Sequence, residues 1–158
     1  MSKTLIGIIG CGNISGAYLK SMAEFSVLDI RALADLRPDA ARAAAVPRNL
    51  RACTVDELLR DESIDIVVNL TTPAAHVEVG LQVIAAGKHV HSEKPLGLNV
   101  ADASRLIDAA VRRGLCVGCA PDTFLGGGHQ TCRQLMDAGA TAFFMCPGHE
   151  RWHPPPAA

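Results

Sequence analysis

Residues 4–16 read TLIGIIGCGNISG, an apolar run that leads directly into a turn rich in glycine. The run is short and contains three isoleucines, which is typical of a buried β-strand. Asn13 follows the second glycine of the turn and opens a helical pattern that extends to Glu24. The stretch therefore predicts a strand, a tight turn and a helix in immediate succession, the beginning of a strand-helix-strand unit.

The same alternation continues along the chain. Further strands are expected over residues 28–34, 64–70, 89–92, 115–120 and 141–146, and further helices over residues 39–45, 54–60, 73–86, 100–113 and 129–138. Thr54 and Glu57 form a capping-box pattern, and Thr72 and Asn99 are expected to cap the two helices that follow them. Strands that alternate with helices build a parallel sheet covered on both faces. The sequence therefore predicts an α/β fold, a Rossmann-type doubly wound parallel sheet.

The composition limits the classes of partner. The 158 residues are 49% hydrophobic, enough for one domain with a buried core, and they carry a formal net charge of -1. No charge excess favours nucleic acid or an anionic membrane surface, and no apolar run approaches the roughly 20 residues that a membrane-spanning helix needs. The chain has six cysteines and no export signal, so we expect reduced thiols in a cytoplasmic protein. Cys116 and Cys119 should point to opposite faces of a strand, and no metal site is expected.

The glycine turn lies where a strand gives way to a helix, which is the context that a phosphate-binding turn requires. Gly10 permits the tight turn, and Gly12 lets a pyrophosphate approach the backbone of Asn13 and Ile14 at the positive end of the helix dipole. Ser15 replaces the third glycine of the G-x-G-x-x-G pattern. The alternative is an ordinary turn between a strand and a helix. The context favours a dinucleotide cofactor, NAD or NADP.

Asp35 comes directly after the expected strand over residues 28–34. A carboxylate there accepts hydrogen bonds from the adenosine ribose and repels a 2′-phosphate, which favours NAD. Arg37 would offset that repulsion, so NADP is the second choice. The alternative for Asp35 is a solvated carboxylate at the end of a strand.

A second group of residues follows the expected strand over residues 64–70. In a parallel sheet they lie at the same edge as the glycine turn, where open α/β sheets bind their ligands. Thr71, Thr72 and Pro73 are therefore expected to line the nicotinamide side. For His76, one turn into the next helix, a cofactor contact and an exposed or capping histidine are both open.

Glu93-Lys94-Pro95 follows the expected strand over residues 89–92, again at this edge. A lysine there can hydrogen-bond a substrate hydroxyl or carbonyl and stabilise charge during hydride transfer, with its proton affinity tuned by burial and by Glu93. The alternative is an ordinary lysine-glutamate pair on the surface.

The glycine turn, Asp35, the stretch from Thr71 to His76 and above all Glu93-Lys94-Pro95 together resemble the N-terminal domain of the Gfo/Idh/MocA oxidoreductases, over about residues 4–146. The resemblance implies hydride transfer between NAD(P) and a hydroxyl-bearing carbon of a sugar or cyclitol, with Lys94 as a catalytic residue and Glu93 beside the cofactor. It also implies that the segment around Pro121 passes under the nicotinamide.

That family has a C-terminal domain that holds the substrate and usually forms the oligomer interface. We therefore expect a dinucleotide-binding domain over residues 1–140 and a remnant of the passage into a missing C-terminal domain over residues 141–158. The expected partners are the small-molecule substrate and further copies of the chain. Two alternatives are a non-catalytic nucleotide-binding or sensor protein and an inactive truncated fragment.

Overall fold

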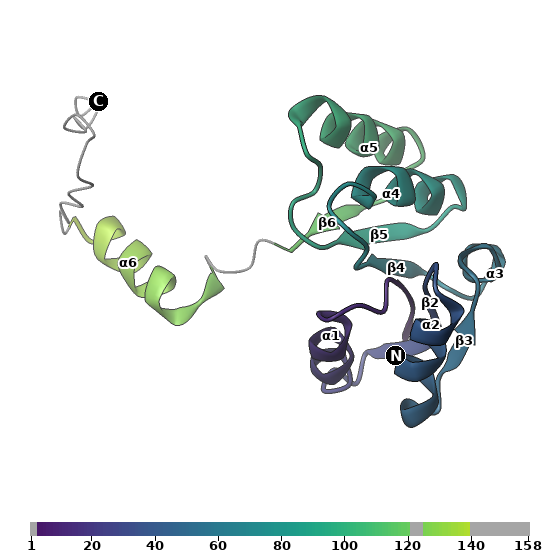
Figure 1. Cartoon of the computed structure of the whole chain (residues 1–158). Helices are drawn as coiled ribbons and strands as arrows, with labels where there is room; N and C mark the ends of the chain where they lie inside the picture. The colour runs from purple at the N-terminus through teal and green to yellow at the C-terminus, as the bar shows by residue number, and fades with distance from the viewer. Residues whose placement is uncertain (1–2, 121–124, 140–158) are drawn as a thin grey trace. The chain divides into compact units, whose positions relative to one another are not determined.

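The computed structural model describes residues 3–120 and 125–139. The chain divides into two compact units, Met1–Pro121 and Asp122–Ala158. Among the described residues, the first unit contains every strand and helices α1 to α5, and the second contains α6, Gly127–Asp137 (Figure 1). The domain boundary expected at residue 140 stays a prediction.

The first unit is built on a parallel six-stranded sheet with the order β3-β2-β1-β4-β5-β6. This is the strand order of the Rossmann fold, so the predicted α/β architecture is confirmed. The chain first moves outward from β1 to one edge and then crosses to the other side of β1 at β4. The strands are β1 Thr4–Ile9, β2 Leu28–Ala34, β3 Arg51–Cys53, β4 Ile66–Asn69, β5 His89–Ser92 and β6 Val117–Cys119.

Helices cover both faces of this sheet. Leu19 of α1 and Ala45 of α2 belong to one buried cluster, whereas Leu58 of α3, Val83 of α4 and Leu106 of α5 belong to another. Figure 1 shows α4 and α5 lying together over β5 and β6. The two clusters correspond to the two faces of a doubly wound sheet. The helices are α1 Ser15–Met22, α2 Pro38–Ala45, α3 Val55–Arg60, α4 His76–Ala85 and α5 Val100–Arg112, with a 3₁₀ turn, η1, over Val46–Arg48.

The sheet differs from the expectation at one edge. The sequence pattern does not predict β3, because this strand has three residues and none of them is β-branched. Its pairing with β2 alone, through Ala32 to Ala34, makes it the edge strand. The strand expected over residues 141–146 lies outside the described residues.

Two of the three expected helix caps are present. Thr54 Oγ1 accepts a hydrogen bond from Glu57 N at 3.2 Å, and Glu57 Oε2 accepts one from Thr54 N at 2.8 Å, which completes the capping box of α3. Asn99 Oδ1 accepts from Asp102 N at 2.9 Å at the start of α5. Local sequence patterns identified both caps.

The start of α4 was expected at Pro73 with Thr72 as its cap, and this is wrong. The helix begins at His76, and its cap residue Ala75 makes no side-chain hydrogen bond. Ala75 N donates to Thr72 O at 2.8 Å, and His76 N donates to Pro73 O at 3.4 Å. These bonds close tighter turns before the helix, so Thr72 and Pro73 stand in a turn at the sheet edge.

In the second unit, α6 agrees with the helix expected over residues 129–138 apart from a small shift of its ends. Gly139 follows it with φ +83°, a conformation that favours glycine at a helix end. Within the described part of the chain, no helix is long and apolar enough to cross a membrane.

Candidate functional site

The residues singled out from the sequence meet at the carboxyl edge of the sheet. Because all strands are parallel, the residues that follow β1, β2, β4 and β5 lie on this edge. Gly10 follows β1, Asp35 follows β2, and Glu93 follows β5. The edge also contains the position where the strand order reverses, between β1 and β4, which is where doubly wound sheets bind their ligands.

Gly10 cannot be replaced by another residue without strain. Its φ is +102°, and a Cβ built on it would lie 2.6 Å from the carbonyl carbon and oxygen of Leu70. The turn after β1 therefore packs directly against the main chain that leaves β4. Gly10 N also donates to Ala34 O at 2.8 Å, which joins the turn to the end of β2.

The rest of the turn is open toward solvent. A Cβ at Gly12 would meet no atom within 4 Å, and the neighbouring Asn13 and Ile14 are exposed. Ser15, in the place of the third glycine, is buried, and its hydroxyl donates to Gly12 O at 2.7 Å. The serine thus holds the turn closed from inside, and the start of α1 remains accessible to an anion.

Asp35 is fixed by two main-chain hydrogen bonds. Its Oδ2 accepts from Cys11 N at 2.8 Å and its Oδ1 accepts from Arg37 N at 2.8 Å. The side chain of Asp35 is 13% exposed, whereas that of Arg37 is 77% exposed with its Nε 3.8 Å from the carboxylate. A carboxylate oxygen can accept more than one hydrogen bond, so Asp35 keeps capacity for a ribose hydroxyl. The nearby guanidinium is free to turn toward a phosphate.

Cys11 is neutral at physiological pH. Burial raises the pKa of its thiol to about 11, and the charge of Asp35 adds to the effect. Its Sγ lies 3.6 Å from Ala34 O. The residue between the two glycines therefore adds no negative charge that would repel a phosphate group.

At the start of α4, His76 is buried, with 1% of its surface exposed. Its Nδ1 lies 2.6 Å from Pro95 O and its Nε2 lies 3.0 Å from Thr71 O. Of the two interpretations left open for His76, the exposed or capping histidine is therefore wrong, because the protein itself engages both ring nitrogens. The cofactor contact stays a prediction. Thr72 and Pro73 are exposed at the same edge.

Asn69, the last residue of β4, organises this region. Its Oδ1 accepts from the hydroxyl of Thr71 at 2.7 Å, and its Nδ2 donates to His76 O at 2.9 Å. Ser92 Oγ, at the end of β5, lies 3.4 Å from the same Nδ2. Asn69 and Ser92 are fully buried and Thr71 is half-buried, so the centre of the network is shielded from water.

Glu93 connects the end of β5 to the glycine turn. Its Oε1 accepts from Tyr18 Oη at 2.9 Å, and its Oε2 accepts from Lys94 N at 2.7 Å. Tyr18 lies on α1, the helix that begins at the glycine turn. The carboxylate of Glu93 therefore bonds to a tyrosine and a backbone N–H, and among the described residues none forms an ion pair with Lys94. The lysine side chain is exposed, and its peptide bond to Pro95 is cis.

Sequence reasoning missed Tyr18, Asn69 and Ser92. A polar residue at the last position of an otherwise apolar buried strand is the signal that would have found Asn69. Ser92 ends a strand that contains two histidines, so this signal does not indicate it. No local pattern indicates Tyr18, whose partner is 75 residues away. Pro121 lies outside the described residues. No three potential metal ligands come together among those that the structure describes.

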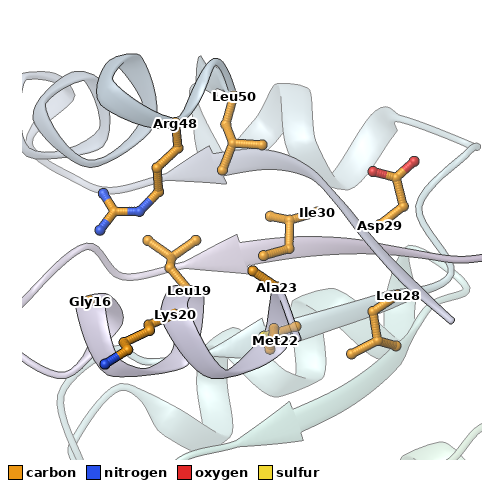
Figure 2. Close-up of a pocket in the computed structure, with 10 residues that line it drawn as sticks. All are labelled: Gly16, Leu19, Lys20, Met22, Ala23, Leu28, Asp29, Ile30, Arg48 and Leu50. Atoms are coloured by element: carbon orange, nitrogen blue, oxygen red, sulfur yellow. The ribbon is translucent and has the colours of Figure 1, made fainter. Parts of the chain in front are cut away.

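A separate groove is lined by residues of α1 and β2 and by Arg48 and Leu50 at and after the end of η1 (Figure 2). Leu19, Met22, Ile30 and Leu50 form its apolar wall, and Figure 2 shows Lys20 and Arg48 near one end. The groove is lined by the first half of β2, whereas Asp35 follows the other end of that strand. It is therefore distinct from the candidate site.

Comparisons with known proteins agree with this geometry. The model of an oxidoreductase family with an NAD-binding Rossmann fold matches residues 4–120. The chain is 30% identical over 115 residues to the inositol 2-dehydrogenase/D-chiro-inositol 3-dehydrogenase of Lactiplantibacillus plantarum, covering 70% of this chain and 33% of that protein. It is 34% identical over 140 residues to the dTDP-3,4-didehydro-2,6-dideoxy-alpha-D-glucose 3-reductase of Streptomyces violaceoruber, covering 85% of this chain and 40% of that protein.

Among solved structures, a 3-ketoreductase from Actinomadura kijaniata in complex with NADP and TDP-benzene is similar, with a TM-score of 0.81 and 27% identity. The match covers 87% of this chain and 43% of that chain. The chain thus spans between 33% and 43% of the length of these three proteins.

Proposed function

This chain belongs to the Gfo/Idh/MocA family of oxidoreductases, whose NAD-binding model matches residues 4–120, and we propose that it binds NAD(P) along the carboxyl edge of its sheet. The bound cofactor serves hydride transfer to or from a hydroxyl-bearing carbon of a sugar or cyclitol. The observation that carries the proposal is that the glycine turn, Asp35 and the Lys94 segment share the carboxyl edge of the sheet and lie on both sides of the point where the strand order reverses.

The residues on the β2 side fit the adenosine half of the cofactor. The open backbone at Gly12 and the start of α1 suit the pyrophosphate, and Asp35 suits the ribose hydroxyls. The pyrophosphate would meet a neutral thiol at Cys11. Asp35 favours NAD, and the exposed Arg37 makes NADP the second choice of cofactor.

The residues on the β4 and β5 side fit the nicotinamide half and the substrate. NAD(P) supplies the carbon that accepts or donates the hydride. Lys94, exposed at this edge, donates a hydrogen bond to the substrate oxygen and stabilises the negative charge that develops there when a carbonyl is reduced. Support for a polyol substrate comes from the names of the two relatives, one acting on inositol and one on a dTDP-linked sugar.

A second candidate is a nucleotide-binding or sensor protein without turnover. It is favoured by one observation, that the family model matching residues 4–120 describes the NAD-binding fold, so the match supports cofactor binding more directly than turnover. Such a protein would bind the cofactor and leave every sugar or cyclitol unchanged.

Calorimetric titration of NAD⁺ and NADP⁺ tests the cofactor assignment. We expect tighter binding of NAD⁺, because Asp35 repels a 2′-phosphate. Asp35→Asn removes this charge and keeps one oxygen that can accept a main-chain N–H. The variant should therefore lower the ratio of NAD⁺ affinity to NADP⁺ affinity by about tenfold, which corresponds to roughly 1.4 kcal/mol. Asp35→Ala would also narrow it but would break both main-chain bonds.

Arg37→Ala is the matched control, because it removes the cation that faces the same region. This variant should weaken the binding of NADP⁺ more than the binding of NAD⁺. Tighter binding of NADP⁺ by the unaltered chain would contradict the NAD preference, and binding of neither cofactor would refute the proposed function.

A further inference from the structure

The His76 side chain connects two segments that are otherwise separate in the chain. Thr71 follows β4, and Pro95 follows β5 directly after Lys94. The imidazole lies between their carbonyl oxygens, 3.0 Å from the first and 2.6 Å from the second. A carbonyl oxygen only accepts hydrogen bonds, so the ring nitrogen that carries the hydrogen is the donor, and the tautomer decides which of the two carbonyl oxygens receives it.

The burial of His76 makes this connection rigid. With 1% of its surface exposed, the ring has no water available to replace a lost partner. The backbone oxygen of His76 is also held, because Asn69 Nδ2 donates to it at 2.9 Å. Asn69 in turn binds the Thr71 hydroxyl, so the ring, its main chain and the end of β4 form one connected network.

The geometry points to His76 as a positioning residue for the nicotinamide half of the site. This inference rests on the proposed function. Among the described residues, no hydrogen bond joins His76 to the adenosine side of the edge at Gly12 and Asp35. The glycine turn meets the segment of Thr71 through the packing of Gly10 against the main chain of Leu70 and Thr71. His76 therefore fixes the distance between the segment of Thr71 and the segment of Lys94 beyond the point where the pairing of β4 with β5 and the bond from Glu93 N to Asn69 O end, and it leaves the adenosine subsite to other residues.

The test compares two ligands that share the adenosine diphosphate ribose portion. NAD⁺ carries the nicotinamide and ADP-ribose lacks it, so their affinity ratio isolates the nicotinamide subsite. We expect His76→Ala to weaken NAD⁺ by about fivefold to tenfold, the loss of one well-placed contact, and to leave ADP-ribose within about twofold. His76→Gln can donate to one of the two carbonyl oxygens. Its NAD⁺ affinity should therefore lie between that of the unaltered chain and that of His76→Ala.

Val83→Ala is the control for loss of stability, because Val83 is fully buried in the same helix and lies far along it from the site. It should lower the thermal midpoint and leave the NAD⁺ to ADP-ribose ratio unchanged. Circular dichroism reports whether each variant is folded. If His76→Ala is not folded, the same ratio measured for His76→Gln decides the question.

Equal weakening of both ligands by a folded His76 variant would overturn the inference and assign His76 a general structural role. An unchanged ratio, or an unaltered chain that binds NAD⁺ no more tightly than ADP-ribose, would also overturn it. Failure of the unaltered chain to bind ADP-ribose would instead contradict the proposed function, so the two failures are distinguishable.

Discussion

At the scale of single residues, Cys11 provides a test that needs no substrate. Its pKa of about 11 lies above the ordinary value of 9.0, so its thiolate fraction at pH 8 is about a hundredfold smaller than that of an ordinary thiol. Cys116 and Cys132 are exposed. We expect iodoacetamide at pH 8 to label these two residues well before Cys11, measured by mass spectrometry of the digested protein.

The denatured chain is the control, because unfolding removes the burial and all six cysteines should then react at similar rates. Early labelling of Cys11 in the folded chain would contradict both its burial and its raised pKa. Such a result would also place a charged thiolate in the proposed phosphate turn.

Individual site residues were predictable where the signal is local. Gly10 and Asp35 stand directly after strands, so a spacing within one strand-helix-strand unit was sufficient to find them. His76 was identified, but its burial between two carbonyl oxygens was not predictable, because its two partners lie on different segments. The Tyr18 to Glu93 hydrogen bond joins residues 75 positions apart, and such tertiary partners leave no trace in local periodicity.

At the scale of elements, the capping box of α3 makes a measurable contribution to stability. Thr54→Ala removes the side chain that accepts from Glu57 N and should lower the free energy of unfolding by about 1 kcal/mol at pH 7, measured by urea denaturation. Thr54→Ser keeps the hydroxyl and should retain most of the stability. An equal loss in both variants would indicate that the methyl group, and not the cap, matters.

The effect of Thr54→Ala on the free energy of unfolding should depend on pH. Hydrogen bonds from the Thr54 backbone and hydroxyl lower the pKa of Glu57 below its ordinary value of 4.5. A lowered pKa means that the carboxylate stabilises the folded state above the ordinary value and that this contribution is lost as the pH falls through the lowered value. The difference between the original chain and Thr54→Ala should therefore shrink in acid.

Element boundaries show where sequence patterns stop being informative. The capping box and Asn99 were found because a cap is a contact between residues three apart. Thr72-Pro73 has the same local character, yet the chain forms a tight turn there and α4 begins at His76. The edge strand β3 was missed because its three residues acquire strand geometry only by pairing with β2.

At the scale of the whole molecule, the described site residues all belong to the first unit. Hydride transfer needs a substrate held about 3–3.5 Å from the cofactor and protected from water. Lys94 is exposed, so the described residues do not protect this position from water. We therefore expect the 158-residue chain alone to bind NAD⁺ and to show little turnover in an NADH absorbance assay across sugars and cyclitols.

Lys94→Ala is the matched variant for this assay. Its NAD⁺ affinity should stay within about twofold, and any turnover of the unaltered chain should fall in the variant, because an interaction made mainly in the transition state appears in kcat. Robust turnover by the 158-residue chain that survives Lys94→Ala would contradict the role of Lys94 and the expectation of low activity together.

The central position of β1 also decides when the site is completed during synthesis. Ile6 pairs with Ile30 of β2, 24 residues later, but with Ile66 of β4, 60 residues later. A ribosome that adds about 5–20 residues per second leaves the second edge of β1 open for about 2–7 s after β2 has emerged, and an open strand edge is a site of aggregation. Gly10 meets the main chain of Leu70 only when that edge closes. The nascent chain therefore passes through a period of exposure to chaperones and aggregation before its phosphate turn takes its final shape.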